Sequence, residues 1–403
     1  MALILTRSPY HISRGLLDAN ASAIVSIGRM DGGSFNIVEE YVLNFRDKYF
    51  IDISKLCSSV YTPDYSYVGI WNQYITSVVG EDSFKFYESG YVTVTISGSI
   101  SGVAQDDQVT NYFCTDGYMY SSDKIDKDFV AELQDNSFYA GSSDIIYKLD
   151  DSNLRIPILN PKDYSSDSYV DVSFLSKGNI VFTDSLLYRD EGDSTFTISR
   201  WARTFDYPSF LNRVNSEEGE YEQSKCIEDF FDEHKIDDVD EVYISAGDKV
   251  KILKVKTVEE CKYNPYRITF RNRYGVMEDL WFFKKSVASM SVTSEEFRAN
   301  QFKQRSSGGR DRDAGLIRSS REYGKNGVES LTINSGFVDE ALNESFKQLM
   351  LSEEVQLYDF NNDVLSAVKI SDSQLKMKTS VNDKLINYTI EVEFSNNIID
   401  DIV

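Results

Sequence analysis

The sequence predicts a mainly β protein built from two or three antiparallel β-sandwich-like domains. Its 403 residues include 26 Tyr, 24 Phe and 3 Trp, beside many Val, Ile and Thr, and these residue types fit a pleated, half-buried sheet. Short runs of alternating apolar and polar residues recur along the chain, with turn residues between them. A chain of this length commonly forms two or three compact units. We expect these units at residues 1–153, 154–295 and 296–403.

The first expected domain has the pattern of an antiparallel meander. Residues 31–34, Asp-Gly-Gly-Ser, form a hairpin turn between two alternating runs. In residues 91–96 the apolar side chains Val92, Val94 and Ile96 share one face, so that one side of the sheet is buried. Strands are predicted at residues 22–30, 35–45, 49–56, 91–96, 111–114 and 118–120, the last two around a turn at residues 115–117.

The central expected domain is also rich in strands and carries an acidic helical insertion. Residues 217–241 hold twelve acidic side chains, and Cys226, Ile227, Phe230 and Phe231 within them have the spacing of a short amphipathic helix. Strands are predicted at residues 156–159, 169–175, 179–182, 195–201, 242–245, 250–255 and 266–270.

The C-terminal region combines a long basic loop, a helix and closing strands. Residues 298–325 hold eight basic and three acidic side chains, a local charge of about +5, and Ser-Ser-Gly-Gly at 306–309 favours a long loop. Residues 336–351 carry an apolar stripe at helical spacing with acidic residues in the first turns. Strands are predicted at residues 355–359, 364–370 and 385–394.

The composition excludes several classes of function. The net charge of −23 repels phosphate backbones, which makes nucleic acid an improbable partner. The only histidines, His11 and His234, lie in no nucleophile motif, and no phosphate-binding glycine motif occurs. We therefore expect no catalytic residues, no metal and no cofactor. Two alternatives stay open: a calcium site at Asp123, Asp126, Asp128 and Glu132, and a glycan-degrading enzyme with paired acids.

The expected location follows from the N-terminus and the cysteines. No segment has the length of a membrane span or the pattern of a signal peptide. The four cysteines lack a regular spacing, which indicates thiols that stay reduced in the cytoplasm where the chain is made.

Two groups of residues are candidates for binding. The basic loop is interpreted as a contact between subunits, with the acidic residues 217–241 as its seat; a solvated loop or nucleic-acid contact are the alternatives. Its candidate residues are Arg298, Lys303, Arg305, Arg310, Arg312, Arg318 and Arg321. The aromatic residues Tyr65, Tyr67, Trp71 and Tyr74 could face a carbohydrate or a host receptor, or pack inside the first domain.

One stretch has a more specific texture. The run YRITFRNRYGVMEDLWF at 266–282 has the form of two strands about a Tyr274-Gly275 turn. With LTINSGF at 331–337 as a helix entry and INYTIEVEF at 386–394 as the ending, it resembles virion structural proteins of tailed bacteriophages, particularly tail and baseplate proteins of phages that infect Bacteroidota. The resemblance covers residues 264–394 and, more weakly, 8–56, and it brings no catalytic residues.

The resemblance implies a fold and a function. Tail-tube-like domains are β-sandwiches with a flanking helix and a long loop that reaches the next subunit, so the central and C-terminal regions would pack as one such unit. The implied function is a non-enzymatic tail or baseplate subunit, located in the virion, that assembles into a ring of its own copies and binds other tail or baseplate proteins. The alternative is a carbohydrate- or host-receptor-binding module of the virion.

Overall fold

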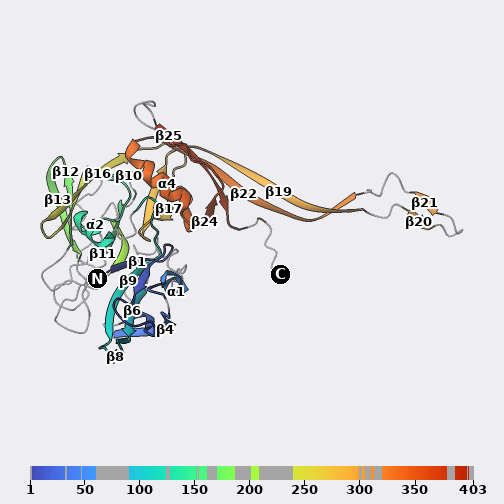
Figure 1. Ribbon diagram of the computed structural model, residues 1–403. Coiled ribbons are helices and arrows are strands. Elements are labelled where there is room, and N and C mark those ends of the chain that lie inside the picture. Colours follow the sequence, from blue (N-terminus) through green and yellow to red (C-terminus); the bar gives the residue numbers. More distant parts are fainter. Residues whose placement is uncertain are drawn as a thin grey trace, which may run out of the picture.

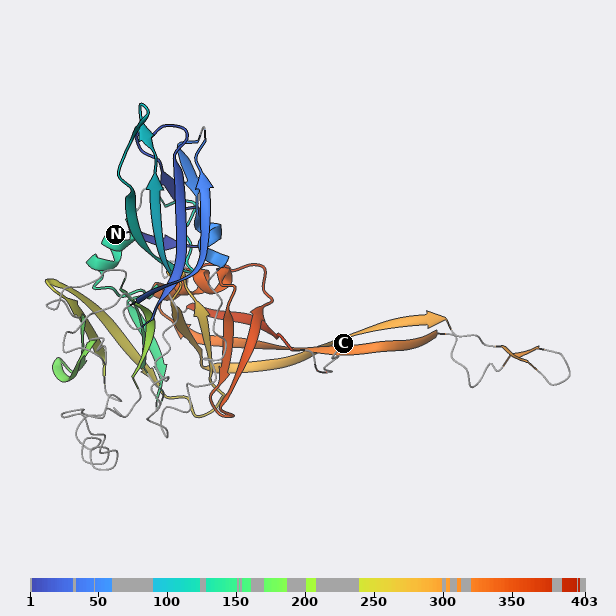
Figure 2. The same ribbon diagram turned by 90° about the horizontal axis from the view of Figure 1, so that it is seen from below.

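The chain forms a body of three main β-sheets from which one long β-hairpin projects (Figures 1 and 2). The computed structural model describes residues 2–31, 34–46, 48–59, 90–123, 128–150, 152, 154–160, 170–186, 201–207, 239–298, 302–304, 310–312, 320–378, 386–396 and 398. Of these described residues, 59% are in strands and 9% are helical, which confirms the predicted mainly β class.

The first sheet contains the N-terminal strands in the order β1-β9-β6-β3-β4. Its strands are β1 (Ala2–Leu5), β3 (Ser22–Asp31), β4 (Ser34–Asn44), β6 (Gly90–Ser97) and β9 (Gln108–Thr115). One face buries Val25, Ile27, Val92 and Val94 against α1 (Ser54–Ser59), which carries Cys57. Two short pairs flank the sheet: β2 (His11–Ser13) with β5 (Phe50–Asp52), and β7 (Ser99–Ile100) with β8 (Val103–Ala104).

The second sheet has the order β10-β16-β15-β12-β13. Its strands are β10 (Ile145–Leu149), β12 (Val170–Ser176), β13 (Asn179–Leu186), β15 (Glu241–Ala246) and β16 (Lys249–Val258), and β11 (Leu154–Asn160) pairs separately with β14 (Trp201–Tyr207). A shared core joins this sheet to the end of the first one through Phe113, Phe174 and the helix α2 (Phe129–Asp135). The first two sheets are therefore packed together rather than linked loosely.

The third sheet has seven strands in the order β18-β17-β23-β24-β25-β22-β19. They are β17 (Tyr266–Arg271), β18 (Met277–Phe282), β19 (Lys284–Arg298), β22 (Ser320–Val338), β23 (Val355–Asp359), β24 (Val364–Ile370) and β25 (Ile386–Phe394). Its core face packs on α4 (Asn343–Leu351), where the Phe346 ring lies 4.2 Å from that of Tyr388 and 6.1 Å from that of Phe282, measured between centroids. This sheet takes strands from both sides of the expected boundary at 295/296, and the domain division stays a prediction.

The hairpin between β19 and β22 is longer than the part of the sheet that supports it. Pairing of β22 with β25 ends at Ser330, whereas pairing with β19 continues to Arg298 and Ser320. We call the two-stranded part beyond that point, Met290–Arg298 with Ser320–Glu329, the arm. At about 3.3 Å per residue it is roughly 30 Å long. The short strands β20 (Phe302–Gln304) and β21 (Arg310–Arg312) pair at its tip.

Three predictions of local structure differ from the structure. Residues 118–120 form no strand, because the chain turns towards Arg273, whose carbonyl oxygen accepts from the Tyr118 amide at 2.8 Å. Residues 331–337 are strand rather than helix entry: Leu331 and Ile333 are buried at the alternating spacing of β22. The helix begins later than residue 336, after Asp339, whose side chain caps the short 3-10 helix η2 (Glu340–Leu342) by accepting from the Ala341 amide.

The basic segment 298–325 is in part strand rather than loop. Arg298 is the last residue of β19, and residues 320–325 belong to β22. The ladder is supported there by the rings of Phe297 and Tyr323, whose centroids lie 5.7 Å apart. The predicted strand at 49–56 is also shorter than expected, since β5 ends at Asp52 and α1 begins at Ser54.

Candidate functional site

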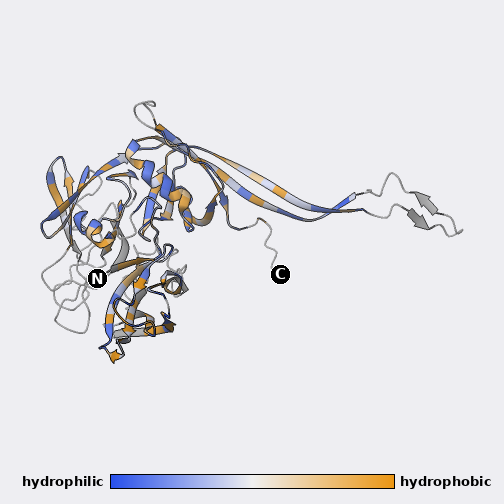
Figure 3. Ribbon diagram, in the orientation of Figure 1, coloured by the Kyte–Doolittle hydropathy of each residue, from blue (hydrophilic) through white to orange (hydrophobic). Residues whose placement is uncertain are grey.

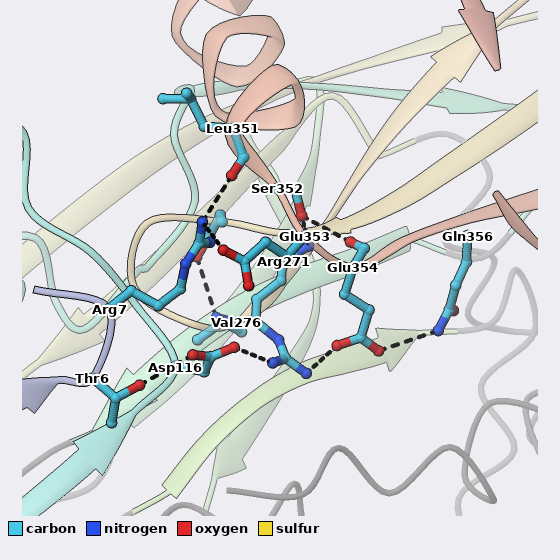
Figure 4. A network of polar contacts seen from close by, with 11 residues as sticks. Thr6, Arg7, Asp116, Arg271, Val276, Leu351, Ser352, Glu353, Glu354 and Gln356 are labelled. Carbon is cyan, nitrogen blue, oxygen red and sulfur yellow. Dashed lines mark hydrogen bonds and ion pairs between the residues drawn. The ribbon is translucent and has the colours of Figure 1, made fainter. Parts of the chain in front are cut away.

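A charged network joins the N-terminal sheet to the seven-stranded sheet. Arg271, at the end of β17, is buried, and its guanidinium contacts Asp116 at 2.5 Å on one side and Glu354 on the other (Figure 4). Burial raises the pKa of Glu354 even though Arg271 acts to lower it. One cation thus neutralises two partly buried carboxylates from different sheets, and removal of either kind of partner would leave an uncompensated charge.

The first strand is attached to the same network. The Thr6 hydroxyl donates to Asp116 at 3.0 Å, and Arg7 donates to the carbonyl oxygen of Leu351 at 3.1 Å. Arg7 also forms an ion pair with Glu353 at 2.8 Å (Figure 4). Because Leu351 ends α4, these contacts fix the N-terminal strand to the helix that covers the seven-stranded sheet. We call the whole contact region between the two sheets, centred on Asp116, Arg271 and Glu354, the joint.

The backbones also meet closely at the joint. An added Cβ on Gly117 would lie 2.3 Å from the carbonyl oxygen of Arg273, and one on Gly275 would lie 2.9 Å from the amide nitrogen of Asp116. Gly275 has a φ of +80° in the turn between β17 and β18. In this turn the Asn272 amide donates a hydrogen bond to the carbonyl oxygen of Val276. Both positions therefore require glycine for contact, and the second also for its backbone conformation.

Arg273 anchors a second polar cluster beside the first. It forms an ion pair with Asp123 at 2.9 Å, and its guanidinium carbon lies 4.7 Å from the centroid of the Tyr120 ring. The Tyr120 hydroxyl donates to Glu344 of α4 at 2.6 Å. Burial would raise the pKa of Glu344, but hydrogen bonds from Tyr120, Gln348 and Lys347 hold it below its ordinary value. The cluster connects the segment after β9 to the C-terminal helix.

A third cluster surrounds the buried carboxyl group of Glu278. Its oxygens accept from the Ser142 amide at 3.1 Å and from the Asn272 side chain at 3.0 Å, and the Ser142 hydroxyl lies 2.5 Å from that of Ser345. Burial raises the pKa of Glu278 above its ordinary value. A buried carboxyl with a raised pKa beside two hydroxyls is a combination that also occurs in active sites.

The size of the cavity beside Glu278 limits which molecules this cluster could bind. It is lined by Glu278, Ser345, Tyr139, Tyr147 and Arg155, and its volume is about 30 Å³. Such a space holds one or two water molecules and no sugar ring. Arg155 is not free for a ligand, because it forms an ion pair with Asp279 at 2.7 Å. The geometry fits a structural polar core between β11, β18 and α4.

The arm is the opposite of the joint in burial and composition. Its side chains include the exposed apolar residues Met290, Val292, Phe297 and Tyr323, which are 47–59% exposed. Figure 3 shows hydrophobic and hydrophilic residues interspersed along both of its strands. A hydrogen bond to Glu295 raises the pKa of Tyr323, so this hydroxyl stays protonated near neutral pH. An isolated two-stranded ribbon is marginally stable, and exposed apolar side chains on it favour contact with a partner.

The structure places some of the predicted site residues and not others. Arg298 and Arg321 are exposed at the distal end of the arm. Lys303, Arg310 and Arg312 belong to β20 and β21 at the tip, and their side chains are not described. Arg305, Arg318, the acidic segment 217–238 with its predicted helix, and the aromatic residues Tyr65, Tyr67, Trp71 and Tyr74 lie outside the described residues.

Of the four residues in the calcium alternative, Asp126 lies outside the described residues. Asp128 caps α2 by accepting from the amides of Val130 and Ala131, and Asp123 is engaged by Arg273. Among the described residues no group of three or more His, Cys, Asp or Glu is arranged to hold a metal ion. No helix within those residues is long and apolar enough to cross a membrane.

Sequence reasoning missed the joint altogether. Its arginines occur in the run RNR at 271–273, which the sequence pattern places only before the Tyr274-Gly275 turn between two strands. Two arginines within three residues of a buried strand end were the available signal, because arginine at such a place requires carboxylate partners. In comparison with known proteins, no protein family matches the sequence, and no curated protein is significantly similar to it.

Proposed function

We propose that this chain is a non-enzymatic structural subunit of a bacteriophage tail or baseplate, which assembles with copies of itself into a ring. Other tail or baseplate proteins would be its further partners, and the virion its location. The observation that carries the proposal is the arm: a two-stranded ribbon with exposed apolar side chains that extends from a tightly joined body. A projecting ribbon of this kind gains stability when a neighbour covers it.

The charge distribution supports contact between copies. Residues 298–325 carry about +5, which leaves −28 on the remainder of the chain. The arm carries the two ends of this basic segment, at Arg298 and Arg321, away from the body, where they can meet the acidic body of a neighbouring copy. Opposite potentials on two copies favour their association and oppose repulsion between the acidic bodies.

The joint supports the same proposal mechanically. Arg271 and Arg273 tie the N-terminal sheet, α4 and the seven-stranded sheet together through buried ion pairs and hydrogen bonds. The base of the β19–β22 hairpin that ends in the arm, at Lys284 and Asn334, lies in that seven-stranded sheet. An arm that leaves a rigid base has a defined direction, which a closed symmetric assembly requires.

Deletion of residues 305–321 tests the proposal. The deletion removes five of the seven candidate contact residues, Arg305, Arg310, Arg312, Arg318 and Arg321. It leaves β19 in place up to Arg298 and β22 from Glu322 onwards. Light scattering should report a smaller assembly than for the full chain. As a matched control, replacement of the same seventeen positions by an uncharged Gly-Ser segment of equal length should give the same loss. An assembly of unchanged mass in both variants would contradict the proposal.

A second candidate function is a carbohydrate- or host-receptor-binding module. One face of the N-terminal sheet is exposed to solvent, where Val42 and Val109 are 64% and 61% exposed. The strand register places these two residues in one row across the sheet, with Ile24 and Thr95 between them. Binding of the full-length protein to a glycan array, lost on replacement of Trp71 by Ala, would support this function. Absence of binding to all glycans would contradict it.

A further inference from the structure

The strand β19 has one edge without a partner among the described strands. It is the last strand in the order of the seven-stranded sheet, and it pairs only with β22. Nearly all of its residues are exposed, including Val287 and Met290, which are 53% and 59% exposed. Its backbone groups on that edge are therefore open to another strand along the length of the arm.

From Val287 to Ser294 this edge lacks the devices that normally prevent pairing. Residues 286–294, SVASMSVTS, contain no charged residue and no proline. Natural edge strands are commonly protected by lysine, proline, bulges or an inward charge. From Val287 onwards the edge is regular, because between Thr293 and Glu295 the ladder advances two residues on β19 and three on β22, which places the extra residue on β22. The bulge on β19 itself lies before this stretch, between Lys284 and Val287. A long, regular and uncharged edge is suited to strand addition.

The charges that flank this edge are arranged symmetrically about Met290. Lys285 lies five residues before Met290, and Glu295 lies five residues after it. If two copies of β19 pair in antiparallel orientation with Met290 opposite Met290, each Lys285, which lies in the β19 bulge, comes close to a Glu295. Lys285 makes no ion pair with the residues that the structure describes, and its flexible four-carbon stem can reach across the strand pair.

The same register also matches apolar side chains. Ala288, Met290 and Val292 point to one face of β19, because side chains alternate along a strand. The pairing places Val292 of each copy opposite Ala288 of the other, on either side of the central methionine pair. Three facing pairs of apolar side chains therefore lie on one face of the two strands. A register shifted by one residue would place each Lys285 opposite Ser294 or Glu296 and would lose the symmetry at the centre.

We propose that the free edge of β19 binds the same edge of a second copy of this chain, about a two-fold axis at Met290. The contact is isologous, so it joins copies in pairs and does not by itself close a ring. Its biological role rests on the proposed structural function, in which it would join two rings back to back. The arm tip and the β19 edge are separate surfaces, so each can be altered without the other.

Cysteine cross-linking tests the register directly. In a chain with Cys226 and Cys261 replaced by Ser, Met290→Cys places two thiols opposite each other across the axis. Opposite residues of an antiparallel pair have Cα atoms about 4.5–5.5 Å apart, which a disulfide can bridge. We expect mild oxidation to convert most of this variant to a covalent dimer on a non-reducing gel.

Val292→Cys in the same background is the matched control. Val292 lies on the same face and is similarly exposed, at 55% against 59%, but its partner is Ala288 of the other copy. Its two thiols are four residues out of register, so little covalent dimer should form. Equal cross-linking of both variants, or no cross-linking of Met290→Cys, would overturn the proposed pairing.

Charge reversal supplies an independent readout. Lys285→Glu places two acidic pairs across the axis and should raise the dissociation constant of the pair about tenfold or more in sedimentation velocity. The double variant Lys285→Glu/Glu295→Lys should restore pairing, because it exchanges the two charges. Lys376→Glu, which changes the same net charge at an exposed site outside β19, should leave pairing unchanged. Single and double variants with equal pairing would overturn the proposal.

The outcomes separate this inference from the proposed function. If the 305–321 deletion reduces the assembly while Met290→Cys does not cross-link, ring formation stands and the two-fold contact is wrong. If Met290→Cys cross-links while the deletion has no effect, the two-fold contact stands and the ring contact is wrong.

Discussion

The joint and the arm of this chain use arginine in opposite ways. At the joint Arg271 is 4% exposed and contacts two carboxylates, whereas at the distal arm Arg298 and Arg321 are exposed. Buried charges with partners hold sheets in one arrangement, while exposed charges act at long range on other molecules. The comparison separates residues that maintain the fold from residues available for assembly, and each prediction below tests that separation.

The largest decrease in the free energy of unfolding is expected from Arg271→Met. The substitution removes the only described cation between Asp116 and Glu354 and leaves both carboxylates partly buried. Loss of one partner of a buried ion pair costs about 3–5 kcal/mol of the free energy of unfolding. Arg298→Met on the arm is the matched control and should change that free energy by less than about 0.5 kcal/mol. Equal effects in urea unfolding would refute the distinction between joint and arm.

Gly117→Ala should produce the next largest loss in the free energy of unfolding. The new methyl group would lie 2.3 Å from the Arg273 carbonyl oxygen, which belongs to backbone and cannot move aside easily. Overpacking of this kind costs about 1–3 kcal/mol. Because Gly117 lies between the N-terminal sheet and the β17–β18 turn, limited proteolysis should also cut the joint region faster. An unchanged midpoint of thermal unfolding would show that the joint is not closely packed there.

Glu278→Gln should flatten the pH dependence of stability. The raised pKa of Glu278 means that the folded protein binds this proton more tightly than the unfolded chain does. The stability contributed by this group is therefore complete below its unfolded pKa, near 4.5, and is lost as the pH rises through the folded pKa. Ser142, Asn272 and Ser345 face the group from the neighbouring elements.

The measurement is thermal unfolding of both proteins between about pH 5 and pH 8. Glutamine does not titrate, so the variant should gain stability relative to the native chain as the pH rises across that interval. A constant difference between the two proteins at every pH would indicate that Glu278 does not change its ionisation on folding.

Phe297→Ala should have the smallest effect on stability and a larger one on assembly. The ring is 47% exposed and contacts Tyr323 on the arm rather than a core. We expect a change of about 0.5 kcal/mol or less in unfolding, with a reduced assembly mass by light scattering. Phe346→Ala in the core below α4 is the contrast, with an expected loss of about 3–5 kcal/mol. A large stability loss for Phe297→Ala would mean that the arm belongs to the folded core.

Local patterns predicted most of the strands but not their partners. The alternation in residues 91–96 and 386–394 and the turn at 31–34 were sufficient to predict β6, β25 and the β3–β4 hairpin. The loop prediction at 298–325 was wrong in part, because the strand extends there through pairing of Arg298 with Ser320 and through the Phe297–Tyr323 contact. Glycine and serine at 306–309 indicated a turn, and a local pattern could not show how far its strands extend.

The candidate site was less predictable for the same physical reason. Arg271, Asp116 and Glu354 are separated by more than 80 residues along the chain, so their contact exists only after the sheets have packed. The symmetry of Lys285 and Glu295 about Met290 is visible in the sequence, but it has meaning only once β19 is known to be an exposed edge. Sequence patterns indicated a basic segment suited to contact, and the structure supplied the arm that carries it.

Electron microscopy of the purified full-length protein tests the central claim most directly. The proposed structural role predicts closed rings with a central hole, formed without any other protein. Single particles of one chain at every concentration would contradict it.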